Sequence, residues 1–182
     1  MQRTLASLLF AATAIHAATG HAAGFQAGSA SIGPDGALSA DNVIEGYGCH
    51  GPNLSPEVHW SGAPAGTKSF AVTVHDVDAP TDSGWWHWTV VDIPSTWTRV
   101  GKGGSASTAA AGALQLRNDF GGAGWGGLCP PAGAAPHRYV FKVFALPVAR
   151  LGIPADATPA LASYMLRAQA LATAQFVGTF GR

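Results

Sequence analysis

Residues 68–93 read KSFAVTVHDVDAPTDSGWWHWTVVDI, and this stretch decides the fold. Its first part, Lys68–His75, alternates apolar residues with smaller or polar ones, and its last part, Trp86–Ile93, is rich in aromatic and β-branched residues. Both patterns are typical of strands, and the Pro and Gly between them are typical of a turn. We therefore predict a strand–turn–strand hairpin that brings Asp76 close to His87.

Strand patterns on both sides of this hairpin predict a β-rich fold. Arg138–Leu146 is apolar on both faces, as expected of a central strand of a sandwich. Shorter strands are predicted at 26–33, 43–47, 58–60 and 176–180. The fold class is thus mainly β, an antiparallel sandwich with peripheral helices.

One helix is predicted near the end of the chain. Thr158 is a good N-cap residue, and Pro159 suits the first helical position. Leu161, Met165 and Ala168 recur at helical spacing, which predicts an amphipathic helix that ends at Gln169.

The connection from about residue 95 to 136 is rich in Gly, Ala and Ser and has little periodicity. Connections of this length are uncommon in compact domains and are often functional or flexible. Residues 118–131 (NDFGGAGWGGLCPP) contain aromatic side chains and a cysteine, so we expect them to be anchored. Residues 101–112 are expected to be mobile.

The N-terminus has the layout of a secretory signal peptide. Arg3 precedes an apolar segment, and the small residues that follow favour cleavage after Ala22; an N-terminal helix of the fold is the alternative. We predict a signal peptide at 1–22, a single domain at 23–182, and a periplasmic or secreted protein. No integral membrane segment is expected after cleavage.

Composition argues against some partners. The chain of 182 residues carries 10 Lys+Arg and 10 Asp+Glu, and loss of Arg3 with the signal peptide leaves a formal charge of −1. This balance gives no support for binding to nucleic acid or to anionic membranes.

Two cysteines, Cys49 and Cys129, lie in Gly- and Pro-flanked segments. In an oxidising compartment, an even pair predicts a disulfide rather than two free thiols. Metal ligation by two isolated cysteines is the alternative.

Catalytic and metal-binding patterns are weak. The sequence contains no GxSxG nucleophile motif, no phosphate-binding GxxxxGK[ST] loop and no HExxH. Side chains that suit a metal exist, but their spacing is not that of a metal site; they are His75, Asp76, Asp78, His87 and His137. We therefore expect no catalytic residues, no resident metal and no cofactor.

A ligand pocket is the third interpretation. His137 and Arg138 open another strand and are expected to converge on Asp76 and His87, with indoles as walls. Asp beside His favours an imidazolium, which suits an anion such as phosphate. In the alternative, Asp76 and Asp78 only hold the turn.

Longer motifs resemble the phosphatidylethanolamine-binding protein family, and its bacterial Raf-kinase-inhibitor-like branch best. DVDAP followed by GWWHW resembles the family's first conserved region, usually DPDAP…WxHW, and the HRY of PHRYVFKVFAL resembles the second. Further similar segments are NLSPEVHWSGAPAGTKSFAVTV, NDFGGAGWGGLCPP and the final FVGTFGR. The resemblance runs from about Asn42 to Arg182.

The resemblance implies a two-sheet antiparallel sandwich with one small anion-binding cavity. Family ligands include phosphate, acetate, cacodylate and phospholipid headgroups. The pocket residues that carry over are Asp76, His87 and His137, with Trp85, Pro130 and Tyr139 as walls. Asp78 and Arg138 match motif positions and are expected to hold loops. Cysteine-bearing bacterial members imply a Cys49–Cys129 bridge at the pocket mouth.

This chain departs from the family pattern at two positions. Val77 replaces the usual proline of DPDAP, which predicts a looser turn. Trp86 stands where eukaryotic relatives often have a second histidine, which predicts a more apolar entrance. An exported protein does not meet a cytosolic Raf-type kinase, so that activity is not carried over.

The leading hypothesis is an exported, non-enzymatic module that binds a small anion or a phosphorylated headgroup. His87 and His137 are expected to donate to the anion while Asp76 orients a histidine. A protein partner that meets the pocket-mouth loops is the first alternative. A hydrolase that uses the Asp/His pocket is the second.

Overall fold

The central hairpin forms as the sequence predicts in a computed structural model, which describes residues 24–182. Strand β3 (Ser69–Asp76) pairs antiparallel with β4 (Trp85–Pro94), and Asp76 lies opposite Trp85. The turn closes at Gly84, whose φ of 69° is in the left-handed region. A Cβ on Gly84 would lie 2.5 Å from the Asp76 carbonyl oxygen, so this turn requires glycine.

The hairpin is part of a five-stranded antiparallel sheet with the order β6-β4-β3-β7-β8. The remaining strands are β6 (Leu114–Gln115), β7 (His137–Leu146) and β8 (Ala172–Phe180). The predicted central strand is confirmed as β7, which lies between β3 and β8. The final strand is longer than predicted because its pairing with β7 continues back to Ala172.

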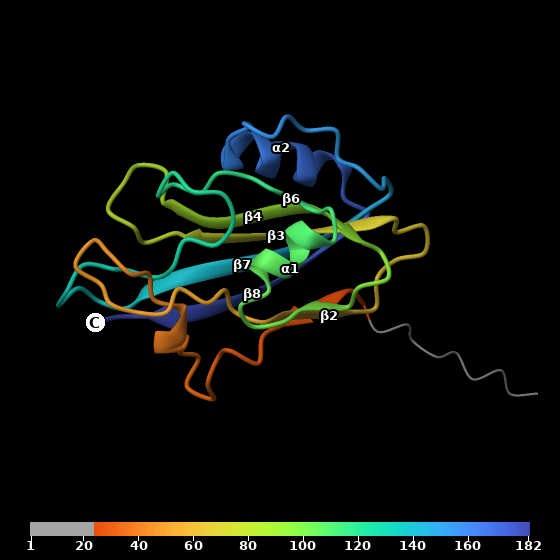
Figure 1. Ribbon diagram of the computed structural model, residues 1–182. Coiled ribbons are helices and arrows are strands. Elements are labelled where there is room, and N and C mark those ends of the chain that lie inside the picture. Colours follow the sequence, from red (N-terminus) through yellow and green to blue (C-terminus); the bar gives the residue numbers. More distant parts are fainter. Residues whose placement is uncertain (1–23) are drawn as a thin grey trace, which may run out of the picture.

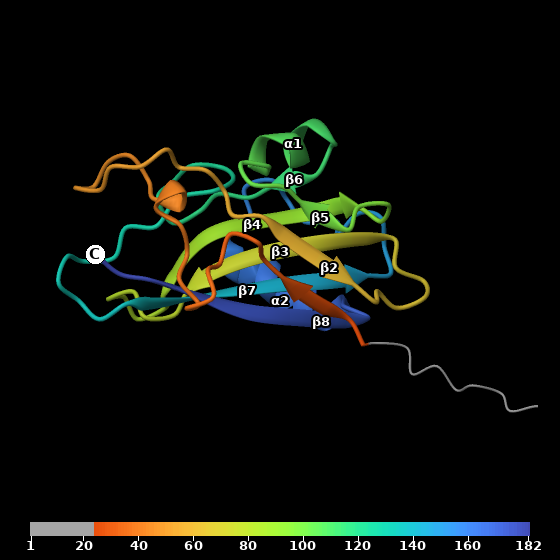
Figure 2. The same cartoon turned by 90° about the horizontal axis from the view of Figure 1, so that it is seen from below.

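A smaller sheet covers one face of the large sheet, and a helix covers the other (Figure 1). The small sheet consists of β1 (Gln26–Gly28), β2 (Val58–Ser61) and β5 (Arg99–Val100). Seen from below, β2 lies in front of the large sheet and helix α2 lies behind it (Figure 2). This arrangement confirms the predicted two-sheet β architecture with a late helix.

Each interface between layers has its own apolar cluster. Trp60 of β2 packs on Phe70 of β3 with their ring centroids 5.0 Å apart, between the sheets. On the opposite face, Leu166 of α2 belongs to a cluster with Val91 and Phe144. β3 contributes to both clusters, which explains why its residues from Ser69 to Val74 are all buried.

Helix α2 (Pro159–Gln169) has the predicted bounds, and the Thr158 hydroxyl accepts a hydrogen bond from the Leu161 amide. The predicted apolar face was right only at Met165, which packs against the cluster under the helix. Ala162 and Leu166 are buried against the sheet, whereas Leu161 is 45% exposed. The many small residues of this helix obscure its amphipathic pattern. The spacing of apolar residues therefore predicted a face adjacent to the one that is buried.

The strand predicted at 43–47 is absent. A short 3-10 helix, η1 (Ala40–Asn42), precedes this segment, and Val43 makes only an isolated bridge to Leu128. Tyr47 has a φ of 56°, so the backbone turns instead of extending.

The long connection contains β5, β6 and helix α1 (Ser105–Ala110). Helix α1 lies within the segment expected to be mobile, and its Thr108 is fully buried. Mobility of residues 101–112 remains a prediction.

Two further features concern membrane segments and the distribution of charge. The predicted signal peptide of residues 1–22 lies outside the described residues. Within residues 24–182, no helix is long and apolar enough to cross a bilayer.

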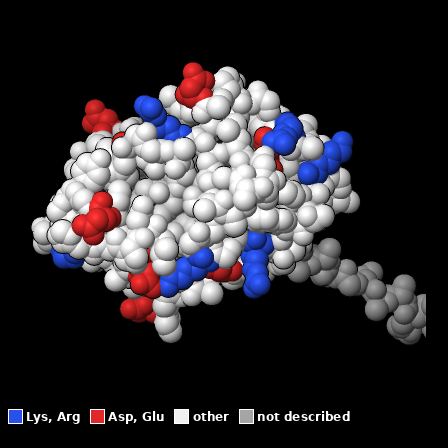
Figure 3. Space-filling view, viewed as in Figure 1, with Lys and Arg blue, Asp and Glu red and all other residues white. Residues whose placement is uncertain are grey.

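Charged side chains on the face drawn in Figure 3 lie mainly near its periphery, around a broad uncharged centre.

Candidate functional site

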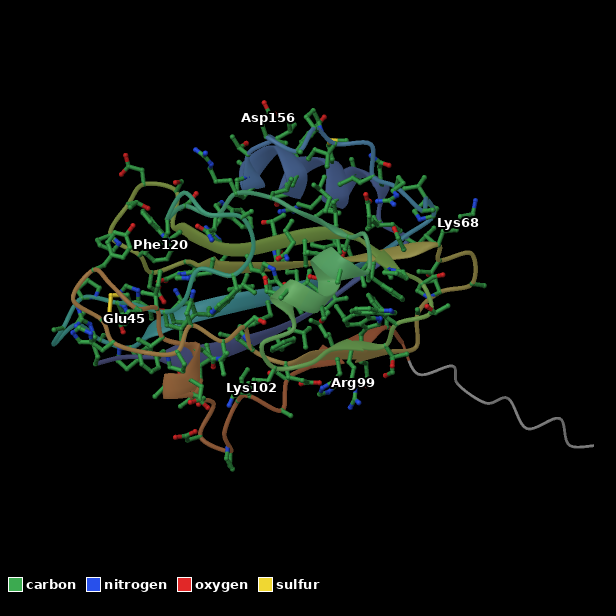
Figure 4. All side chains as sticks on the ribbon, viewed as in Figure 1. Glu45, Lys68, Arg99, Lys102, Phe120 and Asp156 are labelled. Carbon is green, nitrogen blue, oxygen red and sulfur yellow. A yellow bond between two sulfur atoms is a disulfide. The ribbon has the colours of Figure 1, made fainter. Side chains whose placement is uncertain are left out.

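A cavity of about 330 Å³ opens at one end of the sandwich, where β3, β4 and β7 meet the long loops. Five of the six predicted ligand-binding residues line it: Asp76, Trp85, His87, Pro130 and His137. Figure 4 shows Phe120, which also lines the cavity, and the disulfide at this same end of the molecule.

A β-bulge in β4 places the aromatic wall of the cavity. Val74 lies opposite Trp88 and His75 lies opposite Trp86, so His87 is an extra residue in the ladder. In a regular strand, residues 85 and 88 would face opposite sides of the sheet. The bulge allows Trp88 to enter the core while Trp85 and His87 face the cavity.

Asp76 and His137 form a buried pair in the cavity. The Nδ1 atom of His137 donates to Oδ2 of Asp76 over 2.7 Å, and both side chains are less than a tenth exposed. The other carboxylate oxygen of Asp76 accepts from the Asp78 amide at 2.9 Å. Asp76 therefore holds the turn and orients a histidine, which combines the two roles considered for it.

His87 is held by the loop that follows Phe120. Its Nδ1 atom donates to the Gly126 carbonyl oxygen over 2.6 Å, and the Gly126 amide donates back to the His87 carbonyl. Burial lowers the pKa of His87 to about 4, although these contacts and the charge of Asp76 oppose the shift. His87 is therefore a neutral imidazole near pH 7, not the imidazolium that the sequence suggested.

Phe120 is a wall residue that was not among the predicted site residues. Its ring lies 5.1 Å from the Trp85 ring and 5.7 Å from the His87 ring. Asp119 fixes this position, because its carboxylate accepts from the Trp86 amide over 2.7 Å. Phe120 lies in the segment 118–131, which was expected to be anchored because it contains aromatic side chains. That expectation was the only indication from the sequence that Phe120 has a fixed position.

Tyr139 lies beneath the cavity and does not line it. It is opposite Asp76 in the sheet and fully buried, with its ring 5.2 Å from the His87 ring. Burial raises the pKa of Tyr139, and the charge of Asp76 acts in the same direction. The expected wall residue is instead a support for the histidine.

Asp78 and Arg138 hold the hairpin turn against β7, as the family resemblance implied. The Nε and Nη2 atoms of Arg138 donate to the two Asp78 carboxylate oxygens over 2.9 and 2.7 Å. The hydrogen bonds from the Arg138 side chain lower the pKa of Asp78 to about 2. Arg138 is exposed and Asp78 is partly exposed, so this ion pair stabilises the turn only modestly.

Trp86 is not at the cavity entrance, and that expectation was wrong. Its indole stacks on His75, with ring centroids 4.2 Å apart. Residue 86 has the opposite side-chain direction to residues 85 and 87, so it lies on the other face of the hairpin.

The cavity mouth is cross-linked. Cys49 and Cys129 form a disulfide with their Cα atoms 5.9 Å apart. Arg182 lies beside it and also lines the cavity. Its Nε atom donates to the Pro130 carbonyl over 2.7 Å and its Nη1 atom to the Gly48 carbonyl over 2.8 Å.

Several other lining residues were not among the predicted site residues, although Pro131 and Arg182 end two segments that resemble the family. Tyr47, Pro131 and Arg182 reach the cavity only because distant loops meet there. Within residues 24–182, no group of three or more His, Cys, Asp or Glu side chains is arranged to hold a metal ion.

Comparisons with known proteins agree with this architecture. The family described as "Phosphatidylethanolamine-binding protein" matches residues 33–181. The UPF0098 protein YbcL of Escherichia coli is 51% identical over 162 residues, which cover 87% of this chain and 88% of YbcL. The UPF0098 protein YbhB of the same organism is 44% identical over 142 residues, 76% of this chain and 89% of YbhB.

Solved structures match as well. The crystal structure of E. coli YbcL, described as a member of the mammalian PEBP family, superimposes with a TM-score of 0.82 at 48% identity. The superposition covers 88% of this chain and 99% of the YbcL chain. The homologue CT736 from Chlamydia trachomatis gives a TM-score of 0.68 at 27% identity, covering 87% and 98% of the two chains.

Proposed function

This chain belongs to the phosphatidylethanolamine-binding protein family, and from that premise we propose that it is an exported, non-enzymatic protein that binds a small anion or a phosphorylated headgroup. The observation that carries the proposal is the buried Asp76–His137 pair inside a cavity with apolar walls. Buried polar groups in such a cavity fix the orientation of a ligand, and the apolar walls contribute most of its contact area.

The histidines define what the ligand must present. In each ring the protein engages Nδ1 as the donor, so a ligand meets Nε2. In a neutral imidazole that nitrogen accepts a hydrogen bond. The favoured ligand is therefore an anion that keeps one acidic proton, such as a singly ionised phosphate ester.

The walls indicate that the ligand is larger than a bare anion. Trp85, Phe120 and Pro130 surround the polar base with apolar surface. A volume of about 330 Å³ leaves room beyond a phosphate group for the carbon atoms of a headgroup.

Titration calorimetry with inorganic phosphate and with phosphoethanolamine, each at pH 6 and pH 8, tests the proposal. We expect tighter binding at pH 6, because the second pKa of a phosphate ester is near 6 and Asp76 repels the dianion. His137→Ala should abolish the heat of binding. His59→Ala is the matched control, because His59 is an exposed residue of β2. Absence of binding by the wild-type protein to both ligands at both pH values would refute the proposal.

The non-enzymatic part rests on the lack, among the described lining residues, of a nucleophile hydrogen-bonded to His87 or His137. Thr81 supplies a hydroxyl to the cavity wall, but this group donates to the Gly84 carbonyl over 2.5 Å and not to an imidazole. We expect background rates with phosphomonoesters and carboxylic esters. Turnover that disappears in His137→Ala would instead establish a hydrolase.

Export is supported by the disulfide, which persists in oxidising compartments. A relative named "Putative lipoprotein LppC" from Mycobacterium tuberculosis is 38% identical over 138 residues. Fusion of residues 1–60 to alkaline phosphatase, which is active only after export, should give active enzyme. The matched fusion of residues 23–60 should be inactive, and equal activity of the two would contradict export.

A protein partner at the mouth is the second candidate, because Tyr47, which lines the cavity, is a large apolar side chain that is 70% exposed. A pull-down from periplasmic extract with wild type and His87→Ala separates the candidates. Loss of a specific partner in the variant favours the interaction role. Unchanged partners together with lost phosphate binding favour the small-ligand role.

A further inference from the structure

Arg182 is placed at the cavity by the two ends of the disulfide. The carbonyl groups that hold it belong to Gly48, which precedes Cys49, and to Pro130, which follows Cys129. Arg182 lies one residue beyond the part of the chain that matches the family. Its side chain is held by the two loops that the disulfide links.

The charges around the cavity give Arg182 a particular importance. Asp76 supplies a carboxylate, and His87 is neutral near pH 7 because burial lowers its pKa to about 4. A guanidinium stays protonated at every pH that the protein meets. Among the described lining residues, Arg182 alone provides a permanent positive charge, and it offsets the carboxylate that would otherwise repel an anion.

The guanidinium also keeps donors for a ligand. It has five N–H groups, and the Pro130 and Gly48 carbonyls take one each. The remaining donors are restricted in orientation, because the two carbonyl contacts fix the plane of the group. A fixed guanidinium plane suits the oxygens of phosphate or carboxylate.

We propose that Arg182 is an anion-binding residue of this cavity, which receives the ionised oxygens of the ligand while the Nε2 atom of one imidazole accepts a hydrogen bond from its protonated oxygen. This inference rests on the proposed function and adds the residue that selects the charge of the ligand. The ligand class is a singly ionised acid with one protonated and one charged oxygen, carried by an apolar or uncharged group.

Titration calorimetry with inorganic phosphate at pH 6 tests the inference in three variants. Arg182→Gln should bind at least about tenfold more weakly, because a charge-assisted hydrogen bond is lost. Arg182→Lys should lie between wild type and Arg182→Gln, because it keeps the charge but not the planar fork. Arg167→Gln is the matched control, since it removes the same charge from helix α2, and it should bind as the wild type does.

The outcomes separate this inference from the proposed function. If the wild type does not bind phosphate, the proposed function fails and the inference falls with it. If the wild type binds and Arg182→Gln binds equally well, the inference alone is overturned. It is also overturned if Arg182→Lys is no better than Arg182→Gln, because the effect would then come from loosened loops and not from charge.

Discussion

Asp76 is engaged through both of its carboxylate oxygens, one on the Asp78 amide and one on His137. A residue that holds a turn and orients an imidazole cannot be replaced without changing both. His87 has a different constraint, because the protein buries it as a neutral ring. The two histidines of one cavity are therefore held in different ways, His137 by a carboxylate and His87 by a backbone carbonyl.

His87 makes a prediction about acid stability. Its pKa falls from 6.5 to about 4 on folding, so between these pH values the unfolded chain binds a proton that the folded chain does not. The free energy of unfolding should therefore decrease as the pH drops from 6.5 towards 4, by about 3 kcal/mol from this group. His87→Asn should lack this component, because its amide keeps a donor for Gly126 and does not titrate.

Urea unfolding at pH 7, 6, 5 and 4 measures the difference between the two proteins. Two acidic side chains, Asp76 and Asp119, lie near His87 and also titrate. Subtraction of the variant's profile removes their contribution. Parallel profiles for wild type and variant would contradict the assigned cause.

At the scale of elements, the hairpin β3–β4 brings the site together and its bulge corrects the direction of the side chains. The alternation of Lys68–His75 and the aromatic run after Gly84 were sufficient to predict the hairpin, because both are local patterns. The bulge at His87 was not predictable, because it exists only in the pairing of two strands. The same reason explains Trp86, whose placement depends on which side of the hairpin faces the small sheet.

Gly84 tests the turn of this hairpin. Gly84→Ala should destabilise the protein more than Gly66→Ala, although both residues have positive φ values, 69° and 86°. A Cβ at residue 84 would lie 2.5 Å from Asp76 and His75 atoms, whereas residue 66 has nothing within 4 Å. Backbone strain alone costs about 1–2 kcal/mol, which is the expectation for Gly66→Ala.

Thermal and urea unfolding of the two variants provide the measurement. Gly84→Ala should also weaken phosphate binding, because the turn positions Trp85 opposite Asp76. Equal losses of stability in the two variants would show that the close approach at Gly84 is relieved without cost.

At the scale of the whole molecule, sheet order and the cavity walls come from contacts between distant segments. The sequence predicted the half of the site that its motifs encode, Asp76, His87 and His137, and it predicted the disulfide. It did not reveal the roles of Phe120 and Arg182, because the segments that contain them do not show which side chains reach the cavity. These residues acquire their positions from loops that meet only after the two sheets have packed.

The disulfide tests this long-range coupling. Replacement of Cys49 and Cys129 by serine removes a bond across 80 positions, for which chain entropy gives at most about 4–5 kcal/mol of stability. Phosphate binding should weaken as well, because the two carbonyls that hold Arg182 lie on the two linked loops. Reduction of the wild type should reproduce both effects and leave the double variant unchanged. Lost stability with intact affinity would contradict the coupling to Arg182.

Trp85 lines the cavity, and its indole N–H is buried without a hydrogen-bond partner among the described residues. Tryptophan fluorescence responds to the polarity around the indole. The cavity thus contains an intrinsic optical probe, and the emission of unlabelled protein can report when the site is filled.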